Sequence, residues 1–150
     1  MTLKRAIVYP VTIDYTQTFW QMIVAGRYDW RNSDISEKHF SVKGEGVVER
    51  TLELVHYGKN MTPMAALEAI ERKGYRPATI EELLAFGATY PDLPQDFPII
   101  ALGAVWEDPD YYRPREIACL DRDKDGRGLG LDSFFDTEWH AGCRFLAVRK

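Results

Sequence analysis

The C-terminal half of the chain is a series of short apolar runs, and this pattern constrains the fold more than any other feature. The runs lie at residues 98–106, 112–120, 127–132 and 143–149, and charged residues, glycine or proline separate them. Short runs of this kind, bounded by turn-forming residues, are typical of β-strands. We therefore expect four strands in this half, connected by long loops.

Two more strands and a helix are predicted in the first part of the chain. Residues 3–9 predict a short strand with an apolar run at 6–9, and residues 47–57 alternate between apolar and polar side chains. Such alternation favours a strand with one buried face. Residues 15–25 predict a helix, because apolar side chains follow Asp14 and Thr16, either of which can accept a hydrogen bond from the first helical turn.

Two further helices have clear start signals. Thr62 is a good N-cap residue, Pro63 fits the first helical position, and Gly74 provides a stop. The buried face of this helix is expected to consist of Met64, Leu67 and Ile70. Thr79 and Glu82 have the spacing of a capping box, in which each side chain bonds the backbone N–H of the other residue. The next helix is therefore expected to begin at Thr79.

The order of these elements predicts the fold class. The chain has 150 residues, which is the size of one ordinary domain. Helices are expected early and strands are concentrated late, without a regular strand–helix–strand alternation. This order is typical of an α+β fold. We therefore expect residues 1–150 to form a single α+β domain.

Three short segments match the sequence patterns of a known superfamily. They are GYRPATIEEL at residues 74–83, PVTIDY at 10–15 and FLAVR at 145–149. These segments resemble motifs of bacterial C-type-lectin-like domains, which include the formylglycine-generating, sulfatase-modifying group and the variable proteins of diversity-generating retroelements. The chain is also similar to a set of bacterial proteins that share the first and third segments, and this set implies no function.

The resemblance implies a C-type-lectin-like fold, in which two or more helices flank a small, mostly antiparallel sheet with long loops. It also implies a non-catalytic module that binds a protein or small-molecule ligand through its C-terminal loops. One alternative is an oxidoreductase that uses Cys119 or Cys143 as a redox or metal-binding thiol, although the closely spaced cysteine pair of the formylglycine-generating enzymes is absent. Another is a structural protein that binds a partner. Buried, unreactive cysteines would argue against the oxidoreductase.

Aromatic residues in the expected loops at 106–114 and 132–142 are the candidates for ligand binding. Rigid aromatic side chains on loops are typical of binding surfaces. Together with one histidine, the candidate set is Trp106, Tyr111, Tyr112, Phe135, Trp139 and His140. For the two tryptophans of this set we favour the alternative that they fill the core, whereas the two tyrosines are expected to be exposed.

An aspartate-rich segment allows two interpretations. Its spacing matches a calcium loop, and its four carboxylates are Asp121, Asp123, Asp125 and Asp132. The alternative is a β-hairpin in which residues 124–127 form a tight turn with an Asp-Gly pair at its centre. We favour the hairpin, because a calcium loop usually ends on glutamate rather than aspartate and the flanking segments predict strands. No other cofactor is expected.

The charge balance argues against two classes of partner. Nineteen Lys and Arg against 23 Asp and Glu give a net charge of −4. Nucleic acids and anionic membranes both favour a basic surface. No segment predicts a signal peptide or the run of about 20 apolar residues that a membrane helix needs. We therefore expect a cytoplasmic protein that binds neither nucleic acid nor membranes.

Overall fold

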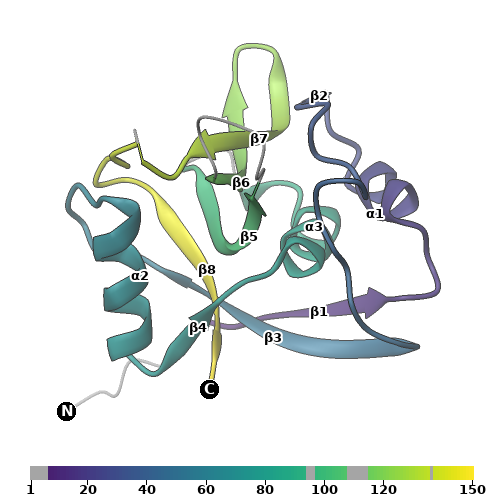
Figure 1. The fold of residues 1–150 in the computed structure, drawn as a ribbon, viewed down its shortest axis with the longest axis horizontal. Helices are drawn as coiled ribbons and strands as arrows, with labels where there is room; N and C mark the ends of the chain where they lie inside the picture. Colours follow the sequence, from purple (N-terminus) through teal and green to yellow (C-terminus); the bar gives the residue numbers. More distant parts are fainter. Residues whose placement is uncertain (1–6, 94–96, 108–114, 136) are drawn as a thin grey trace.

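The computed structural model describes residues 7–93, 97–107, 115–135 and 137–150. Within these residues, eight strands form one mixed sheet, and three short helices pack against it (Figure 1). The strands are β1 (Tyr9–Asp14), β2 (Trp30–Arg31), β3 (Val47–Val55), β4 (Tyr75–Pro77), β5 (Ile99–Glu107), β6 (Arg115–Asp123), β7 (Gly126–Ser133) and β8 (Arg144–Arg149). The helices are α1 (Phe19–Ala25), α2 (Pro63–Arg72) and α3 (Ile80–Thr89).

The strand β8 occupies the middle of the sheet. The order across the sheet is β1-β3-β8-β5-β6-β7-β2. Most neighbouring strands are antiparallel, but β5 and β8 run parallel, and so do β2 and β7. Along one edge β8 pairs with β3, and along the other it pairs with β5 at its start and β4 at its end. In this sheet β8 therefore joins the half that contains β1 and β3 to the half that contains β5, β6 and β7.

The predicted α+β fold, with helices flanking a small C-type-lectin-like sheet, is wrong. The four strands predicted in the C-terminal half do form, as β5 to β8, but their ladders continue through β8 into β3 and β1. The helices are short, with 7 residues in α1 and 10 residues in each of α2 and α3. Because apolar runs far apart in the sequence pair with one another, a large mixed sheet dominates, and the fold is closer to all-β.

Both faces of the central strands are buried. Along β8, Phe145 and Ala147 belong to one hydrophobic cluster, whereas Leu146 between them belongs to a second cluster. Ile99 and Ile100 of β5 divide between the two clusters in the same way. Helices α1 and α3 contribute to the Leu146 cluster and α2 to the Phe145 cluster. Burial on both faces explains why these strands are continuous apolar runs in the sequence.

The first helix begins later than predicted. Its N-cap is Thr18, whose hydroxyl accepts the N–H of Gln21 at 3.1 Å, while the Gln21 side chain accepts the N–H of Thr18 at 2.8 Å. This is a capping box with glutamine in place of glutamate. Asp14 ends β1 instead, and its carboxylate accepts the N–H of Thr16 at 2.9 Å. Neither of the two predicted caps therefore starts a helix.

Two other predictions are corrected in detail. The strand predicted at residues 3–9 meets β1 only at its last residue, and residues 1–6 lie outside the described part of the chain. The helix α2 begins at Thr62 as predicted, but Met64 on its face is 56% exposed. The buried residues of α2 are Pro63, Ala66 and Ile70. These three residues are separated by three and four positions, so they share one face of the helix, and Met64 does not lie on that face.

Candidate functional site

The segment that carries the strongest sequence motif builds a half-buried ion pair at the start of α3. Arg76 donates two hydrogen bonds to the Glu82 carboxylate, at 2.8 and 2.7 Å, and the Thr79 N–H donates a third at 3.0 Å. Burial alone would raise the pKa of Glu82, but these hydrogen bonds and the charge of Arg76 outweigh it, so this pKa lies below its ordinary value. The predicted helix start at Thr79 is confirmed. These contacts hold the turn before α3 in place.

The aspartate-rich segment forms the β6–β7 hairpin, as favoured from the sequence. Asp123 pairs with Gly126, so Lys124 and Asp125 form a two-residue loop, and the turn lies one residue earlier than predicted. Gly126 has a φ of +115°, which glycine adopts without steric cost. The carboxylate of Asp123 accepts the N–H of Asp125 at 2.7 Å. Among the residues that the structure describes, no group of three or more His, Cys, Asp or Glu side chains is arranged to hold a metal ion.

Cys119 on β6 and Cys143 just before β8 are both buried as free thiols. The strand β5 lies between β6 and β8 in the sheet. Burial raises the pKa of Cys119 well above its ordinary value and that of Cys143 to about 11, and the charges of Asp132 and Asp121 raise both further. The thiols therefore stay protonated at neutral pH. Buried thiols with a raised pKa are typical of unreactive cysteines and argue against the oxidoreductase alternative.

The predicted aromatic candidates lie in different surroundings. Trp139 is 4% exposed, and its indole N–H donates to the Asp132 carboxylate at 2.9 Å. Trp106 is half-buried and stacks on His39 with ring centroids 3.9 Å apart. Phe135 is 61% exposed. The remaining candidates are His140, which is exposed, and Tyr111 and Tyr112, which lie outside the described residues. A ligand surface on the C-terminal loops thus stays a prediction.

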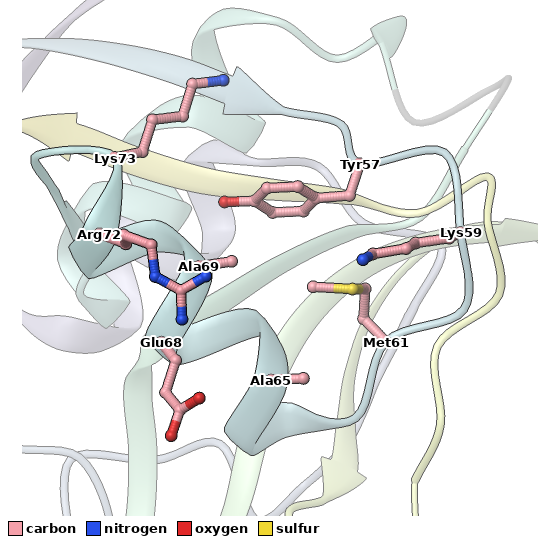
Figure 2. Close-up of a pocket in the computed structure, with 8 residues that line it drawn as sticks. All are labelled: Tyr57, Lys59, Met61, Ala65, Glu68, Ala69, Arg72 and Lys73. Atoms are coloured by element: carbon pink, nitrogen blue, oxygen red, sulfur yellow. The ribbon is translucent and has the colours of Figure 1, made fainter.

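A groove that the sequence did not indicate lies between α2 and the segment that leads into it from β3 (Figure 2). Its volume of about 550 Å³ is within the usual range for small-molecule pockets. The residues that line it are Tyr57, Lys59, Met61, Ala65, Glu68, Ala69, Arg72 and Lys73. One wall is therefore a helix face with two alanines, and the other is an irregular segment with longer side chains.

Backbone contacts hold both walls of this groove. Met61 and Trp139 exchange two backbone hydrogen bonds, at 2.9 and 2.8 Å, which fix the segment before α2 to the chain before β8. The Thr62 hydroxyl accepts the N–H of Ala65 at 3.2 Å and fixes the first turn of α2. The ring of Tyr57 packs near Phe145, with centroids 6.1 Å apart. The groove is thus built on the same elements that bury the core beneath it.

The electrostatics of the groove differ from those of the whole chain. Its lining contains three cations, Lys59, Arg72 and Lys73, and one carboxylate, that of Glu68, whereas the chain as a whole is acidic. The hydroxyl of Tyr57 is buried and has no hydrogen-bond partner among the described residues. Desolvation raises the pKa of Tyr57, and the nearby charge of Arg72 offsets part of this rise. The hydroxyl therefore stays protonated at neutral pH and can donate a hydrogen bond.

No motif in the sequence marks these residues. Cations at the end of a helix are common, because they interact favourably with its dipole. Two alanines four positions apart leave space on one side of a helix, but this spacing is also common in packed helices. The site depends on where the segment between β3 and α2 places Tyr57 and Lys59, and that placement comes from tertiary contacts.

Comparisons of the chain with models of protein families, with curated proteins and with solved structures found no match. The resemblance to the formylglycine-generating group thus remains a prediction from three segments. None of the helices that the structure describes is long and apolar enough to cross a membrane.

Proposed function

We propose that the protein is a non-catalytic binding module whose small-molecule ligand occupies the groove beside α2. The observation that carries this proposal is the Tyr57 hydroxyl, which is buried at the groove without a hydrogen-bond partner among the described residues. Leaving such a group unsatisfied costs about 1–3 kcal/mol. A bound molecule that accepts a hydrogen bond from this hydroxyl would recover this energy. As the sequence predicts, we place the protein in the cytoplasm.

The lining supports binding rather than chemistry on the ligand. Tyr57 is kept in its protonated form, so it serves as a donor and not as a nucleophile. Met61 and the two alanines of α2 supply apolar surface. The two thiols are buried and protonated, which leaves the oxidoreductase alternative without its reacting group. A mostly apolar recess with a few polar groups is the usual form of a small-molecule site.

The proposal can be tested by amide NMR with a chemically diverse set of small fragments. We expect some fragments to shift the amide signals of residues 56–73. The variant Ala65→Trp places a large side chain in the groove at an exposed position, and it should abolish these shifts. Glu71→Trp is the matched control, because Glu71 is exposed on the same helix and does not line the groove. The proposal is wrong if no fragment shifts these signals, or if Ala65→Trp leaves the shifts unchanged.

A further inference from the structure

Positive side chains from two separate elements line the groove. Lys59 comes from the segment before α2, whereas Arg72 and Lys73 come from the end of α2. Figure 2 shows the Lys59 ammonium and the Arg72 guanidinium directed into the space between the two walls. The ring of Tyr57 lies across the same space, with its hydroxyl directed towards the Arg72 end of α2. Three hydrogen-bond donors therefore face one region.

The dipole of α2 accounts for only some of the cations that line the groove. Arg72 lies in the last turn of α2 and Lys73 is its C-cap, so both interact favourably with the helix dipole. Lys59 is not part of the helix, so the helix dipole does not account for a cation on the second wall of the groove. An anion bound between the walls would interact favourably with cations from both of them.

No carboxylate within the described part of the chain neutralises these cations by direct contact. Glu68 lies four residues before Arg72 on α2, a spacing that allows an ion pair. The structure shows no such pair within 4 Å, and Figure 2 shows the Glu68 carboxylate directed away from Tyr57. The positive charge of these exposed side chains thus remains available to a ligand in the groove.

The same recess also offers apolar surface. Met61 from one wall and Ala65 and Ala69 from the other line the part of the groove below the Tyr57 ring (Figure 2). A bare inorganic ion would leave this surface exposed to water. A molecule that joins an anionic group to an apolar body would cover it and gain from its burial.

We infer that the ligand is an organic anion, with a carboxylate or phosphate group on an apolar body. This inference rests on the proposed function and names the chemical class of its ligand. The anionic group accepts hydrogen bonds from Lys59, Arg72 and the Tyr57 hydroxyl. Arginine binds both carboxylates and phosphates through paired donors, so both groups belong to the same class here. The apolar body lies against Met61 and the alanines of α2.

A matched series of probes tests the charge preference by calorimetry and amide NMR. The probes are 4-phenylbutyrate, its uncharged amide 4-phenylbutanamide, phenyl phosphate and inorganic phosphate. We expect one or both of the organic anions to bind about tenfold or more tightly than the uncharged amide, as expected for a hydrogen bond to a charged group. The preference should decrease as salt is added. Whichever of the two organic anions binds more tightly shows whether the groove prefers a carboxylate or a phosphate.

Three variants locate the effect. Lys59→Gln and Arg72→Gln should each reduce the preference for the anion about fivefold to tenfold, and Tyr57→Phe should weaken binding of the anion without altering the fold. Lys124→Gln is the control, because Lys124 is exposed in the β6–β7 turn and does not line the groove. It should leave binding unchanged.

The outcomes separate this inference from the proposed function. If the uncharged amide shifts the signals of residues 56–73 and binds as tightly as the anions, the groove binds ligands but the inference is wrong. If inorganic phosphate binds as tightly as phenyl phosphate, the apolar body contributes nothing, and the inference is also wrong. If no probe or fragment shifts these signals, the proposed function fails as well.

Discussion

Replacing Glu82 by glutamine removes the charge of the buried carboxylate at the start of α3 while keeping its shape. Glu82 is 2% exposed and accepts hydrogen bonds from Arg76 and from the Thr79 N–H. Breaking a buried ion pair costs about 3–5 kcal/mol. The side chain of Arg76 is 38% exposed, so water can solvate it after the change. We therefore expect Glu82→Gln to lower the free energy of unfolding by about 2 kcal/mol.

The neighbouring carboxylate provides the control. Glu81 is also buried, but the structure gives its carboxylate one weak hydrogen bond, from the Tyr15 hydroxyl at 3.4 Å. Glu81→Gln should therefore cost less than about 1 kcal/mol. Both free energies are measured by urea unfolding at neutral pH. Equal costs for the two variants would show that the contacts of Glu82 do not stabilise α3 as argued here.

The difference in stability between the wild type and the Glu82→Gln variant should also depend on pH. The pKa of Glu82 is lower in the folded protein than in the unfolded chain, because Arg76 and the Thr79 N–H stabilise the carboxylate. Its contribution is fully present above the unfolded pKa of about 4.3 and is lost as the pH falls through the folded pKa. The difference in stability between the wild type and Glu82→Gln should therefore shrink below about pH 4. A difference that stays constant between neutral and acid pH would refute the reasoning.

Four other changes have definite expected outcomes. Ile70→Ala should destabilise by about 2–5 kcal/mol in urea unfolding, whereas Met64→Ala should cost less than about 0.5 kcal/mol, because only the first side chain is buried. Gly128→Val should destabilise the fold and alter tryptophan fluorescence, because a Cβ there would overlap the Trp30 indole. Millimolar calcium should leave the Tm unchanged, and a reproducible rise that Asp123→Ala abolishes would restore the calcium interpretation of the hairpin.

Several elements could be predicted from the sequence because their signals are local. The strand β3 alternates, α2 and α3 have recognisable N-caps, and β5 to β8 are apolar runs separated by turn residues. The start of α1 was placed too early because Asp14 and Thr16 are also good N-cap residues, whereas Asp14 bonds the turn after β1 and Thr18 caps the helix. The strands β2 and β4 have two and three residues, and their partners on β7 and β8 define them.

The extent of the sheet could not be predicted because its pairing is not local. The parallel contact between β5 and β8 involves two residue pairs, Ile99 with Arg144 and Ile100 with Phe145, and they decide whether one sheet forms or two. The candidate site was missed for the same reason. Tyr57 and Arg72 are fifteen positions apart in the sequence, and their approach depends on the bridge between Met61 and Trp139. That bridge also fixes Trp139 in the interior.

The position of β8 in the sheet has a consequence for the order of folding. Along the sheet path, β1 and β3 connect to β5, β6 and β7 only through β8, and β8 follows all of these strands in the chain. During synthesis, an antiparallel pair and a three-stranded meander must therefore exist side by side with unpaired edges. Exposed edges of this kind can pair with other chains. Because β8 follows these strands in the chain and pairs with both β3 and β5, the nascent chain is most vulnerable to aggregation before β8 is available to pair.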